Sequence, residues 1–471
     1  MSRLLPDTPV DSLDAYLATE FGGLGLKRAQ ELGPEAVVEE VRRSGLRGRG
    51  GAGFPTGVKW AGVRGQPGTH RYVVANGAEG EPGSFKDRAL MRANPYQLVE
   101  GVLIAGLAVG AVEAFIAVKA SFTEEHAALT RAVQEMQEAG ICPECTVTVV
   151  AGPEEYLYGE EKALLEVIEG KPPLPRLFPP HEHGLFATAP QTGWESVTPE
   201  AGHAGRHESN PTLANNVETL SNVPAILARG SDWFRSVGTS ESPGTQVCTV
   251  VGDVVRPGVG ELAMGTSLRR ALEEIGGGTA SGRSVKAVLS GVANPVVTAD
   301  QLDVELSYEA FRTMGSGLGA AGFIVFDETA CMVEAARLVS RFLYVESCGQ
   351  CPPCKQGSGE ITARLERIEA GVANPTDVAE IGGWLGKVTD GNRCYLAVQE
   401  QQVVASMLRS FPGEVVEHLD GRGCPRPRTL ALPKIVDLAD GVATYDEAQY
   451  RKRPDWTYGT EVQMTTHPPA V

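Results

Sequence analysis

The chain has 471 residues, enough for two to four domains at roughly 100–200 residues per domain. Hydrophobic residues make up 42% and charged residues 21%, an ordinary globular composition that excludes a coiled coil or a disordered chain. The net charge of −17 argues against a protein that binds nucleic acid or an anionic membrane surface.

The start of the chain and its most apolar stretch indicate a cytoplasmic protein. The first nine residues have neither a basic start nor an apolar run, so we expect no secretory signal. Residues 98–118 are interrupted by Glu100 and Glu113, whereas a membrane span needs about 18 consecutive apolar residues, so a buried helix is expected there. Nine cysteines, an odd number, argue against a disulfide framework in such a protein.

The first part of the chain alternates between helical and strand patterns. Residues 1–45 are expected to be helical, with Asp11 capping one helix and Pro34 opening another. Strands are expected at 71–75, near 114–118 and at 146–151, and helices at 98–113, 124–138 and 158–169. This alternation predicts an α/β fold with a mostly parallel sheet.

The pattern changes after residue 170. Residues 171–212, rich in Pro and Gly, are expected to form a long loop, and 215–227 a helix. Residues 245–326 predict a small α+β domain with strands at 246–251, 287–289 and 322–327 and a helix at 268–275. From residue 332 the spacing is helical. We therefore expect an N-terminal helical segment at 1–45, an α/β domain at 46–240, a second domain at 241–330, a helical domain at 331–430 and an arm at 431–471.

A glycine-rich loop is the first candidate binding element. Gly48, Gly50 and Gly53, with Gly51 between them, match the dinucleotide fingerprint by letter. The fingerprint requires a preceding strand and a following helix, but a helical pattern precedes this loop and Phe54-Pro55 follows it, so a standard dinucleotide turn is not expected. The backbone N–H groups can still hold phosphate or a flavin edge, assisted by the charges of Arg49 and Lys59. A plain surface turn is the alternative.

Three further polar segments lie at the ends of expected strands or helices. The first, 76–83, follows a strand and contains Asn76, Glu79 and Glu81. The second is Gly159-Glu160-Glu161 beside Tyr156, and the third begins with Asn215 and Asn216 at an expected helix start. Ligands bind at the carboxyl ends of parallel strands and phosphates at helix N-termini, but each of these signals is weak alone.

The cysteine spacing is the strongest chemical signal. Cys348, Cys351 and Cys354 are two residues apart from one another, and Cys394 follows 40 residues later. Three closely spaced thiolates and one distant thiolate can surround a [4Fe–4S] cubane. Structural zinc usually takes two separated pairs of ligands, and Cys394 has no paired ligand beside it, so zinc or no metal are the less favoured alternatives.

The other cysteines give weaker signals. Cys142-x-x-Cys145 is a single pair, interpreted as unligated loop cysteines, although a redox or metal role is open. Cys248 and Cys331 lie in apolar surroundings and are interpreted as core residues, and Cys424 gives no signal.

Five segments together carry a specific resemblance. In order they are SGLRGRGGAGFPTGVKW (44–60), NGAEGEPGSFKDR (76–88), YGEE (158–161), NNVETL (215–220) and ESCGQCPPCKQG (346–357). The set closely resembles the NADH-oxidising flavoprotein subunit of respiratory complex I, the F type, and the related diaphorase subunits of NAD-linked hydrogenases and formate dehydrogenases. The resemblance covers roughly residues 30–425.

The resemblance implies a fold and a set of site residues. It implies a Rossmann-like flavin-binding domain, a small β-grasp-like domain and a helical bundle that carries a [4Fe–4S] cluster. FMN is implied under the Gly48–Gly53 loop, with Lys59, Asn76, Asn215 and Asn216 around its ribityl phosphate. NADH is implied on the flavin, with Phe54 packing on the dinucleotide, Glu81 near the nicotinamide, and Glu160 and Glu161 near the adenosine ribose. The same site includes Arg49, Gly51, Glu79, Tyr156 and Gly159.

The implied activity is NADH dehydrogenation. A flavin takes a hydride from NADH and passes single electrons to the cluster, which accepts one at a time. The implied partners are a thioredoxin-like [2Fe–2S] subunit and a further iron–sulfur subunit, in a complex that can lie on the inner face of the membrane. The physiological electron acceptor remains open: the chain can serve quinone through complex I, a hydrogenase or a formate dehydrogenase.

The sequence departs from the family pattern at three positions. Ala75 replaces a usual cysteine, Ala78 stands in place of an aspartate that helps to hold the flavin, and Gly62 in place of an aromatic residue that contacts NADH. Residues 176–212 are also longer than usual. The alternative interpretation is therefore a divergent electron-transfer subunit that keeps the cluster but binds FMN and NADH weakly; a zinc-stabilised nucleotide-binding scaffold is a third possibility.

Overall fold

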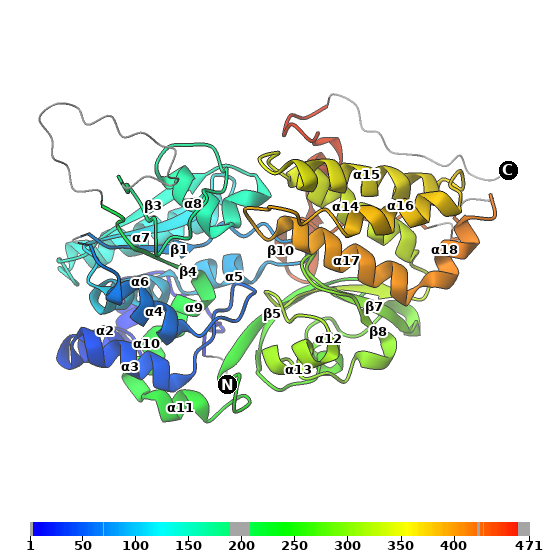
Figure 1. Ribbon diagram of the computed structural model, residues 1–471. Coiled ribbons are helices and arrows are strands. Elements are labelled where there is room, and N and C mark those ends of the chain that lie inside the picture. Colours follow the sequence, from blue (N-terminus) through cyan, green and yellow to red (C-terminus); the bar gives the residue numbers. More distant parts are fainter. Residues whose placement is uncertain (1–2, 69, 189–207, 422–423, 427, 460–471) are drawn as a thin grey trace, which may run out of the picture.

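The computed structural model describes residues 3–68, 70–188, 208–421, 424–426 and 428–459. Figure 1 shows an α/β part, a second sheet with its helices, and a helical bundle, which meet near the centre of the molecule. This arrangement confirms the predicted α/β class with a helical C-terminal region.

The first sheet is entirely parallel. Its strands are β1 (Tyr72–Asn76), β2 (Glu113–Lys119), β3 (Thr146–Gly152) and β4 (Thr212–Asn216), in the order β3-β2-β1-β4. The helices of this part are α1 (Leu13–Leu17), α2 (Leu24–Leu32), α3 (Pro34–Ser44), α4 (Thr56–Gly65), α5 (Lys86–Ala93), α6 (Pro95–Val109), α7 (Thr123–Glu138), α8 (Glu161–Ile168), α9 (Val217–Ser221), α10 (Val223–Arg229) and α11 (Ser231–Arg235). Strand β2 pairs with one side of β1 and β4 with the other, so the chain changes direction across the sheet at β1. The carboxyl end of the β1–β4 pair is therefore a topological switch point.

Two local predictions were wrong. The helix expected at 215–227 is preceded by strand β4, which ends at Asn216, so Asn215 lies within a strand. Asn216 then caps α9, where its side chain accepts a hydrogen bond from the Glu218 N–H at 3.0 Å. At the N-terminus, Ser12 rather than Asp11 caps α1, because the helix begins at Leu13 and only Ser12 is placed to accept from the Ala15 N–H.

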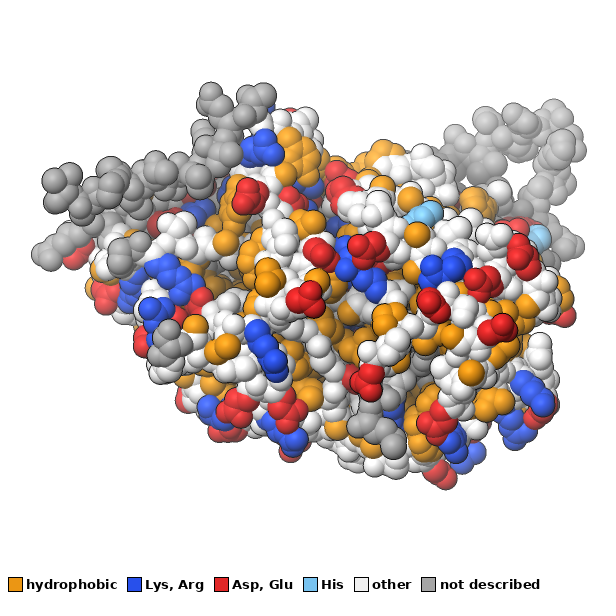
Figure 2. All heavy atoms as spheres, turned by 180° about the vertical axis from the view of Figure 1, so that it is seen from behind, with side chains coloured by type: hydrophobic (Ala, Val, Ile, Leu, Met, Phe, Trp, Pro, Cys, Tyr) orange, Lys and Arg blue, Asp and Glu red, His pale blue; other side chains and the backbone are white. Residues whose placement is uncertain are grey.

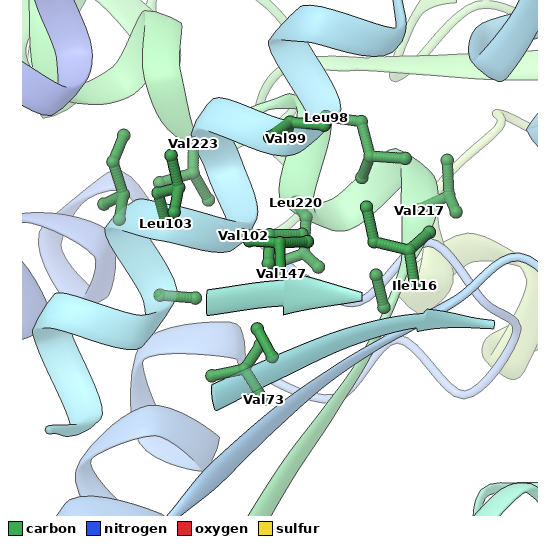
Figure 3. Close-up of a cluster of buried hydrophobic side chains, with 14 of the residues drawn as sticks. Val73, Leu98, Val99, Val102, Leu103, Ile116, Val147, Val217, Leu220 and Val223 are labelled. Carbon is green, nitrogen blue, oxygen red and sulfur yellow. The ribbon is translucent and has the colours of Figure 1, made fainter. Parts of the chain in front are cut away.

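Helix α6 forms the centre of the α/β core. Its apolar side chains lie against the sheet, and Figure 3 shows Val102 among Val73, Ile116 and Val147 of three strands. Fourteen of its fifteen residues are buried, which accounts for the apolar run in the sequence. The N-terminal helices α1, α2 and α3 contribute to the same hydrophobic cluster, so they share one core with the first sheet.

The second sheet is mixed and has the order β6-β5-β9-β7-β8. Its strands are β5 (Thr245–Gly252), β6 (Gly258–Ala263), β7 (Val285–Ser290), β8 (Val297–Thr298) and β9 (Gly322–Asp327), and its helices are α12 (Leu268–Glu274) and α13 (Tyr308–Met314). Strands β5 and β9 pair in parallel, and the other pairs are antiparallel.

The helical bundle and a hairpin complete the described chain. The helices are α14 (Met332–Glu346), α15 (Pro352–Glu369), α16 (Pro375–Leu385), α17 (Leu396–Ser410) and α18 (Pro412–His418), and the hairpin strands are β10 (Ile435–Ala439) and β11 (Val442–Tyr445). None of the helices in the described ranges is long and apolar enough to span a membrane. On the face shown in Figure 2, acidic and basic side chains are interspersed rather than gathered by sign.

Candidate functional site

A cavity of about 610 Å³ lies where the three parts meet. Its volume is in the range of sites that hold a cofactor-sized ligand. It opens at the carboxyl ends of β1 and β4, whose terminal residues Asn76 and Asn216 lie opposite each other in the sheet register. Its lining comes from segments far apart in the chain: 50–52, 76–87, 156–160, Asn216, 290–294, 308–320 and 394–399.

Two glycine-rich loops form one wall of the cavity. Gly51 pairs with Gly319 in an isolated antiparallel bridge, and both have positive φ angles, of 132° and 58°. Gly50 lies so close to Asn216 that a Cβ on it would be 3.0 Å from the Asn216 Cβ. A side chain at position 50 would therefore press against Asn216, and one at position 319 would meet the Asn294 amide nitrogen at 2.6 Å. Helix α3, not a strand, precedes the first loop, so this is not the standard dinucleotide turn, as predicted.

Tyr308 packs against the Gly48–Gly53 loop and fixes its position. Its hydroxyl donates to the Gly48 carbonyl at 2.7 Å, and the Arg47 guanidinium lies 4.6 Å from its ring centre. Gly53 has a φ of 63°, and a Cβ there would be 2.4 Å from the Tyr308 ring. Glycine at position 53 is therefore required both by the backbone conformation and by the ring.

A buried charge cluster supports the asparagine at the end of β4. The Lys86 ammonium lies 2.7 Å from Asp87 and 2.9 Å from Glu218, and all three side chains are buried. The Asn216 amide donates to Asp87 at 2.7 Å and accepts from Lys86 at 3.2 Å. Burial alone would lower the pKa of Lys86, but the surrounding carboxylates raise it above its ordinary value, so the ammonium stays charged.

Three of the predicted carboxyl groups line the cavity. Burial raises the pKa of Glu79 to about 7, with the nearby Asp87 charge adding to the effect. Burial also raises the pKa of Glu160 to about 7 and that of Glu81 above its ordinary value. Clusters of carboxyl groups with raised pKa values beside a cavity are typical of functional sites.

Glu81 is fixed by a chain of hydrogen bonds. It accepts from the Tyr156 hydroxyl and, at 2.6 Å, from the Val292 N–H, while the Gln399 amide donates to Tyr156 at 2.8 Å. The carboxyl group is thus held by residues from all three parts of the molecule.

The structure brings nine of the predicted flavin and nucleotide residues to the cavity: Gly50, Gly51, Asn76, Glu79, Glu81, Tyr156, Gly159, Glu160 and Asn216. Asn76 also joins two of the predicted segments, because its amide donates to the Gly159 carbonyl at 2.7 Å. Ala78, one of the departures from the family pattern, lies on the same wall.

Other predicted residues lie behind or beside the cavity rather than on its lining. Lys59 and Glu161 form an ion pair at 2.8 Å, and neither is among the lining residues. Asn215 is buried and accepts from the Trp60 indole N–H at 2.8 Å.

The remaining predicted residues are in the first glycine loop. Phe54 is exposed and also lies outside the lining, and Gly48 and Gly53 contact Tyr308. Arg49 is buried and donates to the Pro243 carbonyl at 2.8 Å, while its Nε and Nη1 have no hydrogen-bond partner among the described residues.

Several lining residues were not predicted from the sequence, among them Asp87, Asn294, Tyr308, Arg312 and Gln399. The second glycine-rich run, 315–322, carries a sequence signal that could have identified it, since it repeats the composition of the first loop. Asp87 belongs to the segment 76–88, one of the five that carry the resemblance. The others become neighbours only through the folding of distant parts of the chain.

The four predicted cluster cysteines gather at one end of the helical bundle. Cys348 follows α14, Cys351 immediately precedes α15, Cys354 is in the first turn of α15, and Cys394 precedes α17. The Arg393 N–H donates to the Cys351 sulfur at 3.3 Å. Cys394 also lines the cavity, so the cysteine site and the cavity share a wall.

The sulfurs of these four cysteines are not arranged as a ready-made tetrahedral site for a single ion. All four cysteines are described and free, and no three of their sulfurs lie within 4.8 Å of one another. A tetrahedral zinc ion would bring all four to about 3.8 Å separation, because Zn–S bonds are about 2.3 Å long. Burial raises the pKa of Cys354 and of Cys394 to about 12, and the positive charge of a bound metal centre would favour their thiolate forms.

Comparison with known families agrees with both sites. Residues 41–225 match the family described as the Nuo51 FMN-binding domain, and residues 334–418 match the NADH-ubiquinone oxidoreductase-F iron–sulfur binding region. The first match contains strands β1 and β4, and the second contains all four predicted cluster cysteines.

Individual relatives cover most of the chain. The second F-type subunit of the NADH-quinone oxidoreductase of Rhizobium meliloti (strain 1021) is 37% identical, over 88% of this chain and 97% of that protein. The HndC subunit of the NADP-reducing hydrogenase of Solidesulfovibrio fructosivorans is 35% identical, over 90% of this chain and 84% of that protein. The crystal structure of the NAD⁺-reducing [NiFe]-hydrogenase in the H₂-reduced state matches with a TM-score of 0.73 and 30% identity, over 88% of this chain and 66% of that chain.

These matches confirm the resemblance drawn from the five sequence segments. The relatives are subunits of multi-subunit redox enzymes. The chain belongs to the family of NADH-oxidising FMN and [4Fe–4S] subunits that contains the F-type subunits of the NADH-quinone oxidoreductases and the diaphorase subunit of NADP-reducing hydrogenase.

Proposed function

We propose that the cavity holds FMN with the reacting end of NADH, and that Cys348, Cys351, Cys354 and Cys394 hold the [4Fe–4S] cluster. The observation that carries this proposal is the position of Cys394, which belongs to the cysteine site and also lines the cavity. A flavin in the cavity would then be next to the cluster. When bound, FMN supplies the conversion of a two-electron hydride into single electrons.

The residues of the cavity fit a flavin phosphate and its polyol chain. Gly50 and Gly51 present backbone to the cavity with no side chain in the way. Asn76 and Asn216 line the same edge and are held in fixed orientations by Gly159 and by Asp87 with Lys86. Lys86 is already paired with Asp87 and Glu218, so its part in this site is to fix the orientation of Asn216.

The protein holds the side chains around the reacting end in defined positions. Glu81 is held by Tyr156 and Val292, so its carboxyl group keeps one position beside the cavity. Burial raises the pKa of Glu81, and each of its oxygens, which already accepts one hydrogen bond, has a second lone pair that can accept from a carboxamide N–H. We assign Glu81 to orientation of the nicotinamide amide on this basis.

The nucleotide end is assigned to the rim of the cavity. Glu160 lines the cavity, while Glu161 and Lys59 form an ion pair beside it, and exposed Phe54 offers an aromatic face at the first glycine loop. Both Glu161 and Phe54 are accessible to a dinucleotide that extends out of the cavity.

The proposal also assigns a role to each domain and names the expected partner subunits. We assign residues 46–240 to FMN and NADH, 241–330 to the second sheet domain and 331–430 to the cluster, with the cavity between them. The expected partners are a thioredoxin-like [2Fe–2S] subunit, which accepts the electrons, and a further iron–sulfur subunit. In a quinone-linked complex these subunits would keep the chain at the inner face of the membrane.

The test is flavin binding by the purified chain. The apoprotein should take up one FMN per chain, and anaerobic NADH should bleach the flavin absorbance. Failure to take up FMN, with the cluster intact, would favour the divergent electron-transfer subunit instead.

A further inference from the structure

A second group of potential metal ligands lies outside the site described above. The sulfurs of Cys331 and Cys424 and a ring nitrogen of His418 all lie within 4.8 Å of one another. The Cys331 sulfur is 3.5 Å from Nε2 of His418. In a tetrahedral zinc site the S–N edge is about 3.5 Å, given bonds of about 2.3 Å to sulfur and 2.0–2.1 Å to nitrogen.

The three ligands come from three separate segments. Cys331 caps the start of α14, His418 is the last residue of α18, and Cys424 lies in the segment that leads to the β10–β11 hairpin. Cys331 and His418 are fully buried, and Cys424 is partly buried. Free rotation of the two buried side chains is therefore restricted, and the ligand atoms are already directed at one point.

The surroundings orient the ligands as in known metal sites. Nδ1 of His418 lies 2.6 Å from the Glu414 carbonyl, which acts as acceptor and leaves Nε2 with a free lone pair toward Cys331. The Glu334 N–H donates to the Cys331 sulfur at 3.5 Å. Metal-bound histidines commonly donate their second ring N–H to a carbonyl in this way, which fixes the tautomer.

This group is separate from the [4Fe–4S] site. Cys331 precedes the 15-residue helix α14 and Cys348 follows it. At 1.5 Å per residue the helix separates the two by about 22 Å. The group therefore does not supply a ligand to the cluster.

We propose that Cys331, His418 and Cys424 bind one Zn²⁺ ion, with a water molecule as the fourth ligand. Two thiolates and an imidazole are preferred zinc ligands. The ion would join the end of the second sheet domain, the last helix of the bundle and the segment before the hairpin, so its role is structural. Cys424 is replaced most safely as a test, since it is the least buried ligand.

The experiment is metal analysis of the purified chain with its cluster intact. Wild type should contain about one zinc and four iron atoms per chain. Cys424→Ser should lose most of the zinc and keep the iron. The control variant Cys142→Ser replaces a buried cysteine elsewhere in the chain and should keep both metals. Zinc-free wild type, or a Cys424→Ser variant that keeps its zinc, would overturn the proposal.

X-ray absorption at the zinc edge gives a test on the unaltered protein. The proposal requires two sulfurs, one imidazole nitrogen and one oxygen around zinc. Four sulfurs would place the zinc at the Cys348 site and overturn the proposal. A Cys331–Cys424 disulfide, seen by mass spectrometry of the freshly purified, unreduced protein, would also overturn it.

Discussion

Gly53 is the residue in the first glycine loop whose backbone and surroundings both exclude a side chain. Its φ is 63°, and a Cβ would meet the Tyr308 ring at 2.4 Å. Tyr308 in turn anchors the loop through its hydrogen bond to Gly48. The loop conformation is therefore coupled to a ring that lines the cavity.

Gly53→Ala is expected to weaken FMN binding. Forcing a non-glycine residue into the left-handed region costs about 1–3 kcal/mol, and the clash with Tyr308 adds to it, so the Kd should rise by roughly 5- to 150-fold if the loop relaxes in the free protein. Quenching of flavin fluorescence on titration of the apoprotein measures this Kd. Gly62→Ala is the matched control, because a Cβ there has no neighbour within 4 Å. An unchanged Kd in Gly53→Ala would show that the loop does not contact the flavin.

Lys119 provides a test of buried charge at the end of β2. Its side chain is buried and donates to the Glu154 carbonyl at 3.1 Å, and burial, with repulsion from Lys434, lowers its pKa to about 8. The unfolded chain binds the proton more tightly, since a free lysine has a pKa near 10.5. Stability is therefore reduced below pH 8 and recovers as the pH rises from about 8 to 10.5.

Lys119→Met should accordingly raise the Tm at pH 7. The shift in pKa corresponds to a cost on the order of 3 kcal/mol at most, which methionine does not incur, although it loses the hydrogen bond to Glu154. The difference in Tm between variant and wild type should shrink between pH 8 and pH 10. Exposed Lys27→Met serves as the control and should show no such trend. A constant difference across this range would mean that Lys119 is charged in the folded protein.

At the scale of elements, the first turn of α8 and its neighbour α4 bear on nucleotide choice. Glu160 caps α8 by accepting from the Lys162 and Ala163 N–H groups, at 2.9 and 3.0 Å. Glu161 does not cap the helix; it pairs with Lys59 of α4. The carboxylate of Glu161 is therefore free of a structural capping role, and the ion pair positions it at the rim of the cavity.

Glu161→Gln is expected to shift the preference from NADH toward NADPH. A carboxylate about 4 Å from a 2′-phosphate repels it by about 1 kcal/mol even in bulk water, and the substitution also releases the positive Lys59. The ratio of kcat/KM for NADPH to that for NADH should rise by about fivefold or more. Glu39→Gln, which breaks a more exposed ion pair with Arg42 away from the cavity, is the control. An unchanged ratio would remove Glu161 from nucleotide recognition.

The elements predicted from the sequence are those with local signals. The helix at 124–138, the strand at 146–151 and the strand at 322–327 follow from apolar periodicity and were found within one residue of the prediction. Strand β4 was predicted as the end of a loop and the start of a helix, because its residues TLANN are stabilised by pairing with β1, which is distant in sequence. Local patterns carry no information on such long-range partners.

The same distinction applies to the sites. The three closely spaced cysteines are a local motif and were recognised, whereas Cys331, His418 and Cys424 span 94 positions and left no pattern. Tyr308 and Gln399 likewise reach the cavity from other parts of the chain. Residues of the first glycine loop and of the polar segment 76–83 were predicted, because glycine loops and strand ends are local features.

At the scale of the whole molecule, the main feature is that all three parts contribute to one cavity. The α/β part supplies the strand-end asparagines, the second sheet domain supplies the second glycine loop, and the bundle supplies Cys394 and Gln399. A change in the packing of the parts would therefore alter both the flavin site and its contact with the cluster. Cys351 is a cleaner target than Cys394 for separating the two cofactors, because it does not line the cavity.

Electron paramagnetic resonance of the cluster tests the central claim most directly. Anaerobic NADH should reduce the [4Fe–4S] cluster of the FMN-loaded chain and produce its signal, while the chain stripped of FMN should show no signal until FMN is restored. Cys351→Ser should bind FMN and let NADH bleach it, yet give no normal cluster signal. Cluster reduction by NADH that is equally fast without FMN, or a normal signal in Cys351→Ser, would contradict the account.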